Sequence, residues 1–211
     1  MATGSNTPYY TPEEYLWQEQ RADFKSDYYQ GKIYALAGGS LQHSQIAVNL
    51  LGELRSGLRG RDCRLFNSDV KVGMTRTKST GRKPRSRERE DFITYPDATV
   101  VCGQPLYYKD DHHTLANPLI IFEVLSPSTR NYDRTFKFEQ YRHIPSLALY
   151  VLIDSEQVRV GCLRRVEEGG WLVEPPLEEI SESLKLAALG VEIPLALLYE
   201  GVEFEPESEN L

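Results

Sequence analysis

The chain has 211 residues, of which 40% are hydrophobic, and it carries a formal net charge of −7. This length and composition suit one domain with a buried core and exclude a wholly disordered chain. The acidic balance argues against indiscriminate binding of nucleic acid by the whole surface.

The sequence contains no segment that predicts a membrane span or a secretory leader. No apolar stretch approaches the roughly 18 residues that are needed to cross a bilayer. Residues 1–5 lack the basic and apolar regions of a signal peptide. We therefore expect a cytoplasmic protein with no membrane segment.

The first 58 residues predict two helices with a hairpin between them. Thr11-Pro12-Glu13-Glu14 is a typical helix start and predicts a short helix to about Gln20. Residues 27–37 predict a hairpin that turns near Gln30-Gly31. Aliphatic residues at every fourth position then predict a helix over residues 41–58.

The segment after the second helix predicts a sheet. We expect strands at 64–74, 97–102, 119–125 and 147–153, a loop at 103–117 and a helix at 131–143. The order helix, three strands, helix, strand predicts an α/β (α+β) fold, a mixed sheet with helices packed on it. Beyond residue 154, we expect a hairpin that turns at 167–170, a strand at 183–189 and a short helix after Pro194.

No internal repeat or domain boundary is apparent in this pattern. We therefore expect one domain over residues 1–211, with a core at about 27–154. A β extension would follow at 155–202, and residues 203–211 would form an acidic tail.

Three cysteines, Cys63, Cys102 and Cys162, are widely spaced in the chain. They contain no CxxC pair, so their pattern indicates neither a disulfide framework nor a zinc ribbon. We expect all three to be reduced and to pack mostly as small buried apolar residues.

The segment from residue 75 to residue 90 is strongly basic, with a net charge of +5 in an otherwise acidic chain. Such an arm is a candidate for contacts with phosphate groups. The alternative is a solvated loop with no role in binding. The candidate nucleic-acid-binding residues are Arg76, Lys78, Arg82, Lys83, Arg85 and Arg87.

Two carboxylates stand in or beside apolar segments, where a charge is costly to bury. Glu123 interrupts the apolar run 119–125, and Asp97 opens the apolar run 98–101. A buried carboxylate has a large desolvation cost unless another group compensates it. We expect Asp97 and Glu123 to meet at the sheet edge if their strands pair suitably.

The helix predicted after Glu123 carries further polar groups. Asp133, Lys137 and Tyr141 are four residues apart, so they share one helix face. Two carboxylates and an ammonium could neutralise one another. They could also hold a divalent metal ion and an attacking water, as metal-assisted phosphodiester hydrolysis requires.

These residues resemble a known superfamily. Tyr95-Pro96-Asp97, followed by the string 122–126, resembles the signature of the PD-(D/E)XK, restriction-endonuclease-like phosphodiesterases. The longer string 123–129, with Asp133, Lys137, Tyr141 and the strand 150–154, resembles more specifically the Uma-type restriction endonucleases. The resemblance covers about residues 27–154, and the Gly31 turn and His43 also match that family.

The resemblance implies a restriction-endonuclease-like fold and an enzyme that hydrolyses DNA. Asp97 and Glu123 would bind Mg²⁺ or Mn²⁺, and Lys137 would orient or help deprotonate the attacking water. The superfamily lysine would fall at Leu125 in this chain, so the resemblance implies that Lys137 replaces it from the following helix. His43, Asp133 and Tyr141 would support these groups. Nucleases of this fold often act as dimers, so a homodimer is one candidate state, with the C-terminal hairpin as the candidate interface, and the oligomeric state stays open.

Simpler interpretations of the same residues stay open. Asp97 could be a turn residue that accepts backbone hydrogen bonds, and Glu123 could form only a buried salt bridge. Lys137 could lie on a solvated helix face, where a pair with Asp133 contributes about 0.2–0.5 kcal/mol. Asp133 could interact only with the helix dipole.

The remaining polar residues and the function also have simpler interpretations. His43 could be a boundary histidine and Tyr141 a packing residue, and we expect His112-His113 to lie in an exposed loop. The competing function is a non-catalytic module that binds nucleic acid or protein and keeps the nuclease fold. A carboxylate-based hydrolase of small molecules lacks a sugar-stacking pattern to support it.

Overall fold

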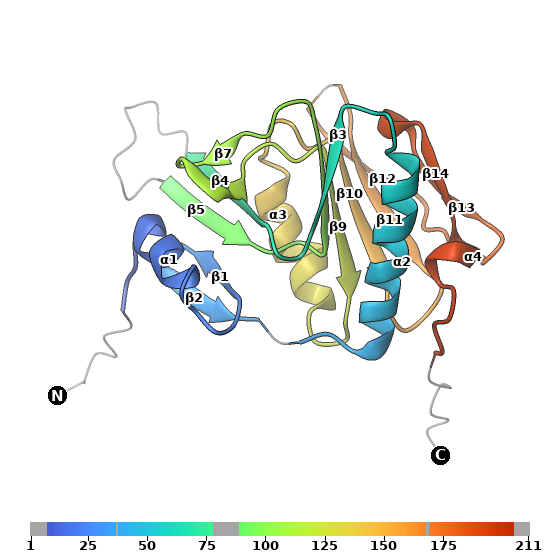
Figure 1. Ribbon diagram of the computed structural model, residues 1–211, viewed down its shortest axis with the longest axis horizontal. Coiled ribbons are helices and arrows are strands. Elements are labelled where there is room, and N and C mark those ends of the chain that lie inside the picture. The colour runs from blue at the N-terminus through green and yellow to red at the C-terminus, as the bar shows by residue number, and fades with distance from the viewer. Residues whose placement is uncertain (1–7, 37, 78–88, 168, 205–211) are drawn as a thin grey trace, which may run out of the picture.

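The computed structural model describes residues 8–36, 38–77, 89–167 and 169–204. Its described strands form two large mixed sheets and a small antiparallel pair (Figure 1). The strands of the first sheet lie in the order β2 (Lys32–Ala35), β1 (Ser26–Tyr29), β5 (Arg89–Thr94), β4 (Lys71–Thr77), β8 (Asp111–Leu115) and β7 (Tyr107–Tyr108). Those of the second lie in the order β12 (Trp171–Val173), β11 (Val160–Arg165), β10 (Leu149–Asp154), β9 (Ile120–Leu125), β6 (Ala98–Cys102) and β3 (Cys63–Asn67).

The small pair consists of β13 (Ser183–Leu186) and β14 (Val191–Pro194). The described helices are α1 (Pro12–Glu19), α2 (Leu41–Gly57), a π-helix η2 (Tyr132–Lys137), α3 (Phe138–Tyr141), a 3-10 turn η3 (Ala187–Leu189) and α4 (Leu195–Leu198). No helix in the described ranges is long and apolar enough to cross a membrane.

The N-terminal predictions are confirmed. Thr11 and Glu14 form a reciprocal capping box at the start of α1, with N–O distances of 3.1 and 2.7 Å. Strands β1 and β2 form the predicted hairpin, in which Gln30 and Gly31 both have positive φ, at 46° and 85°. This backbone matches the twist of the flanking strands. Gly31 also lies against the ring of Tyr9, so a side chain there would collide with it.

The predicted order of helix, three strands, helix and strand is present in the second sheet, as α2, β3, β6, β9, the continuous helix η2–α3 and β10. Strand β9 lies between β6 and β10, and all six of its residues are buried. Helix α2 and the helix η2–α3 lie on opposite sides of this sheet (Figure 1).

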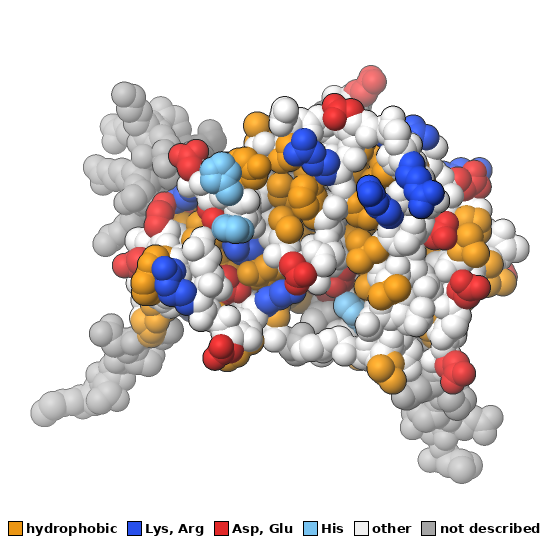
Figure 2. Space-filling view, in the orientation of Figure 1, with side chains coloured by type: hydrophobic (Ala, Val, Ile, Leu, Met, Phe, Trp, Pro, Cys, Tyr) orange, Lys and Arg blue, Asp and Glu red, His pale blue; other side chains and the backbone are white. Residues whose placement is uncertain are grey.

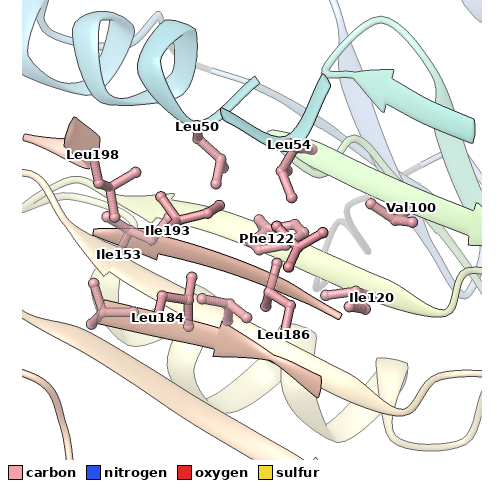
Figure 3. Close-up of a cluster of buried hydrophobic side chains, with 14 of the residues drawn as sticks. Leu50, Leu54, Val100, Ile120, Phe122, Ile153, Leu184, Leu186, Ile193 and Leu198 are labelled. Carbon is pink, nitrogen blue, oxygen red and sulfur yellow. The ribbon is translucent and has the colours of Figure 1, made fainter. Parts of the chain in front are cut away.

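The two faces of β9 enter different hydrophobic clusters, as strand alternation predicts. Ile120 and Phe122 pack with Leu50 and Leu54 of α2 and with residues of β13, β14 and α4 (Figure 3). Ile121 and the rest of the other face pack with the helix η2–α3. Full burial of one such aliphatic side chain contributes about 1.5–3 kcal/mol, so these contacts fix the helices on the sheet.

Several segments differ from the sequence prediction. Strands β5 and β14 were not predicted, and the strand expected at 183–189 ends at Leu186, where η3 follows. The expected strand at 64–74 is two strands, β3 and β4, which belong to different sheets. Asn67 separates them, because its side-chain oxygen accepts the amide of Asp69 and its backbone oxygen accepts the amide of Val70.

The expected loop at 103–117 contains the hairpin β7–β8, which turns at Lys109 and Asp110 with positive φ. Strand β8 pairs in parallel with β4, through Lys71–Thr114 and Val72–Leu115. That long-range pairing has no local signature in the sequence, and it stabilises a segment that reads as polar loop.

The cysteine prediction is wrong for two of the three residues. Cys63 and Cys102 form a disulfide between directly opposed residues of β3 and β6. Cysteine spacing does not report this register, because the two residues are 39 apart in the sequence. Cys162 is free and buried, as predicted.

Candidate functional site

Asp97 and Glu123 come together because β6 and β9 are antiparallel neighbours. Ala98 pairs with Phe122, so the next residues outward along the two strands are Asp97 and Glu123. Oδ2 of Asp97 accepts the amide of Val124 at 2.7 Å, which holds its carboxylate at the end of the ladder. The two acids thus meet at the sheet edge, as predicted. Asp97 also accepts a backbone hydrogen bond, as the simpler interpretation expects, but the donor is Val124 of β9.

Lys137 lies between two carboxylates. Its Nζ is 3.1 Å from Oε1 of Glu123 and 3.0 Å from Oδ1 of Asp133. The side chains of Lys137, Glu123 and Asp133 are only 7%, 3% and 4% exposed, which excludes the solvated helix face considered for Lys137. Asp133 and Lys137 both belong to the π-helix η2, a widened helical geometry that often occurs at functional sites.

Two tyrosines donate hydrogen bonds to Glu123 and Asp133. Tyr141 donates a hydrogen bond of 3.1 Å to Oε1 of Glu123. Tyr150 of β10 donates one of 2.9 Å to the backbone oxygen of Asp133. Both rings are fully buried in the cluster beneath η2–α3, so Tyr141 combines packing with a polar contact to the site.

His43 reaches Asp97 from the first turn of α2. Ser40 caps this helix, and its hydroxyl accepts the amide of His43. Nε2 of His43 lies 3.3 Å from Oδ1 of Asp97. Gly39 leaves room for the ring, because a side chain there would approach Nδ1 of His43 to 2.6 Å.

Burial and charge shift the pKa values of these groups in opposite senses. Burial raises the pKa of Glu123 well above its ordinary value, against the opposing charge of Lys137. Burial alone would lower the pKa of Lys137, but the charges of Glu123 and Asp133 outweigh it and raise that pKa. For His43, likewise, the hydrogen bond and charge of Asp97 outweigh burial, so its pKa is raised.

Asp27 of β1 bonds to a residue of the pocket, Tyr132, and the sequence analysis did not single it out. Its carboxylate is 1% exposed and accepts a hydrogen bond of 3.1 Å from the hydroxyl of Tyr132. Burial raises the pKa of Asp27, while the charge of Lys137 opposes the rise. The alternation of side chains along β1 could have indicated this position, because it places Asp27 on the same face as Tyr29. Tyr29 packs against Phe136 of η2.

One pocket of about 370 Å³ collects most of these groups. It lies at the end of β9, and the glycines before α2 and the hydroxyl-rich segment 126–129 form part of its wall. Lys25 also lines it, but its ammonium is 2.7 Å from Asp69. The predicted site residues that line the pocket are His43, Asp97, Glu123, Asp133 and Lys137.

Three acidic side chains line this pocket. Asp97, Glu123 and Asp133 share it with Lys25, Lys137 and His43. Among the described residues, no group of three or more His, Cys, Asp or Glu side chains is arranged to hold a metal ion. Asp97 and Glu123 offer two carboxylates to this pocket, a donor type that suits Mg²⁺ sites in which waters and substrate oxygens complete the coordination.

The candidate nucleic-acid-binding residues fall mostly outside the described ranges. Lys78, Arg82, Lys83, Arg85 and Arg87 belong to the segment 78–88, which the structure does not describe. Arg76 lies on β4, with its guanidinium 3.9 Å from the carboxylate of Glu90. Acidic and basic side chains are interspersed on the face shown in Figure 2.

The two adjacent histidines lie apart from the pocket. His112 and His113 are exposed residues of β8, and the ring of His112 packs against Tyr107 at 4.4 Å between centroids. The expectation that they are exposed is confirmed, although they lie on a strand and not in a loop. They do not line the pocket of Asp97 and Glu123.

Two proteins match this chain in sequence over most of its length. The chain is 35% identical to the "Uncharacterized protein slr1290" of Synechocystis sp. over 199 residues, which cover 93% of this chain and 95% of that protein. It is 32% identical to "Uncharacterized protein sll1609" of the same organism, over 86% of this chain and 96% of that protein.

A solved structure has the same fold. It is described as "a putative nuclease belonging to DUF820" from Anabaena variabilis, and it matches with a TM-score of 0.64 and 19% identity. The match covers 90% of this chain and 97% of that chain. The sequence profile of the family Uma2, described as "Putative restriction endonuclease", matches residues 12–196. The chain therefore belongs to the Uma2 family, as the resemblance of its motifs implied.

Proposed function

We propose that this protein is a divalent-metal-dependent DNA endonuclease. The observation that carries the proposal is one pocket lined by Asp97, Glu123 and Asp133, in which Nζ of Lys137 lies 3.1 Å from Glu123 and 3.0 Å from Asp133. Buried ion pairs are weak stabilisers, and apolar replacements are often as stable. Three acids that are each less than one-fifth exposed in one pocket are better explained by binding of a cation than by stability. Family membership supports nuclease chemistry.

Asp97 and Glu123 would hold Mg²⁺ or Mn²⁺ through their carboxylate oxygens. They come from paired strands, so the sheet fixes their separation. A bound divalent ion would supply Lewis-acid activation of water and stabilisation of negative charge on the phosphate. Binding would favour the ionised form of Glu123, whose pKa burial raises.

Lys137 would orient the attacking water and offset charge on the phosphate. Its pKa is raised by Glu123 and Asp133, so the group remains an ammonium at neutral pH. This favours orientation over the alternative of proton abstraction. His43 is 19% exposed at the pocket and lies next to Asp97, so it would support the outer end of the site.

Cleavage assays with a matched pair of variants test the proposal. Purified protein is incubated with supercoiled plasmid or single-stranded circular DNA, with Mg²⁺, with Mn²⁺ or with a chelator. We expect metal-dependent cleavage that Glu123→Gln slows at least about a hundredfold. Glu139 is an exposed acid of α3 that does not line the pocket, and Glu139→Gln should cleave like the unmodified protein.

The proposal fails if no divalent metal and no DNA form gives cleavage above that of Glu123→Gln. Calorimetry with Mn²⁺ and gel retardation of DNA then test the competing function. DNA binding without metal uptake, unaffected by Asp97→Ala, would favour a non-catalytic binding module.

A further inference from the structure

We propose that Asp27 is a positioning residue of this site, which acts through Tyr132 to hold the ammonium of Lys137 in place. The expected effect on catalysis rests on the proposed function. The expected effect on the position of the Lys137 ammonium does not, because that position can be observed without any activity.

Asp27 is an unusual buried carboxylate. It is 1% exposed, and its Oδ2 accepts the hydroxyl of Tyr132 at 3.1 Å. Burial raises its pKa, whereas the charge of Lys137 and hydrogen bonding from Thr94 and Tyr95 favour its charged form. A buried carboxylate has a large desolvation cost, so its presence calls for a role.

Tyr132 connects Asp27 to the site. It is the first residue of η2 and lines the pocket. Its ring lies 5.8 Å from Nζ of Lys137, within the range of a cation–π contact. The ring also stacks on Phe136, with centroids 5.2 Å apart. A hydroxyl held by Asp27 and a ring held by Phe136 leave Tyr132 little freedom to move away from the ammonium.

The bond between Asp27 and Tyr132 joins two parts of the fold. Asp27 lies on β1 of the first sheet, whereas η2 follows β9 of the second sheet. The charge of Asp27 also acts on Lys137 directly, alongside those of Glu123 and Asp133. Asp27 therefore holds Tyr132 beside the ammonium of Lys137 and adds a negative charge that favours the ammonium form.

The experiment compares this aspartate–tyrosine pair with a matched pair elsewhere. Asp27→Asn removes the charge of the acceptor and Tyr132→Phe removes the donor of the bond, and each change nearly preserves shape. Asp91→Asn and Tyr108→Phe make the same two changes in an aspartate–tyrosine bond of 2.5 Å in the same sheet, away from the pocket. All four variants are made in the full chain, and circular dichroism checks that each one is folded.

The first readout does not need activity. The ¹H–¹⁵N NMR signal of the Lys137 ammonium is assigned by its loss in Lys137→Met. We expect this signal to shift and broaden in Asp27→Asn and in Tyr132→Phe, and to stay unchanged in the two control variants. An unchanged signal in both Asp27→Asn and Tyr132→Phe would overturn the proposal.

The second readout is cleavage of DNA. We expect kcat to fall about tenfold in each site variant with KM within about twofold. The double variant should be no slower than the slower single variant, because the pair acts as one unit. Fully additive losses, or a change in KM alone, would overturn the proposal. If the unmodified protein does not cleave DNA at all, the proposed function fails and the NMR result alone decides the position of Lys137.

Discussion

Lys137 and Glu123 form an ion pair of 3.1 Å in which both side chains are more than nine-tenths buried. The two residues belong to different elements, β9 and η2, and Asp133 completes the environment of the ammonium. Such a pair makes the stability of the fold depend on a site that we assign to function.

Replacement of Lys137 by methionine should destabilise the protein strongly. It leaves Glu123 and Asp133 buried next to each other without their cation, and loss of one partner of a buried pair costs about 3–5 kcal/mol. Urea unfolding at pH 7 measures the change. Arg142→Ala is the control, because it breaks an exposed pair with Glu139 and should cost no more than about 1 kcal/mol. Equal small losses in both variants would show that Lys137 is not essential to compensate the buried acids.

The contact between His43 and Asp97 should make stability depend on pH. A raised pKa means that the folded state binds the proton more tightly than the unfolded state. The resulting stabilisation is complete below the ordinary histidine value of about 6.5 and is lost as pH rises through the folded pKa. The difference in unfolding free energy between the unmodified protein and His43→Gln should therefore shrink between pH 6 and pH 9.

Asp97→Asn gives an independent check of the same contact. It removes the charge that raises the pKa of His43 but leaves the burial that lowers it, so this pKa should fall below its ordinary value. An NMR titration of the His43 ring follows the change. A His43 pKa that is the same in both proteins would contradict the ion pair.

The disulfide between Cys63 and Cys102 should stabilise the folded protein. A cross-link over 39 residues contributes about 2–4 kcal/mol, chiefly because it restricts the unfolded chain. Unfolding with and without a thiol reductant measures this contribution, and Cys162→Ser serves as a control that leaves the bond intact. Titration of free thiols in the denatured, unreduced protein should find one per chain, and a count of three would disprove the bond.

Leu54→Ala tests the core beneath α2. Leu54 is fully buried in the main cluster, so its truncation should cost about 2–5 kcal/mol. Val48 lies on the same helix and is 61% exposed, so Val48→Ala should change stability by no more than about 0.5 kcal/mol. Comparable losses in the two variants would contradict the predicted orientation of α2.

Much of the local structure follows from sequence patterns. The four-residue spacing in α2, the capping box of α1, the turn at Gln30-Gly31 and the apolar run of β9 each specify an element through short-range physics. The placement of Glu123 within a buried strand was also visible, because every neighbour in its run is apolar. The family resemblance was also visible in the sequence, because the spacing of Asp97, Glu123 and Lys137 follows the family motif.

The partners of these elements were not visible in the sequence. The polar segment 103–117 becomes a hairpin only because β8 pairs with β4, and the cysteines bond only because β3 and β6 place them opposite each other. Asp27 enters the site because β1 faces η2 across the fold. Contacts of this kind depend on strand register between distant segments, which local periodicity does not encode.

The sequence by itself determined which residues could supply the acids and the amine, and on which elements they would lie. Only the tertiary structure decided that Lys137 is buried between Glu123 and Asp133, that His43 reaches Asp97, and that Asp27 bonds to Tyr132. The physical reason is that helix and strand propensities act over a few residues, whereas burial and charge pairing arise when separate sheets and helices pack together.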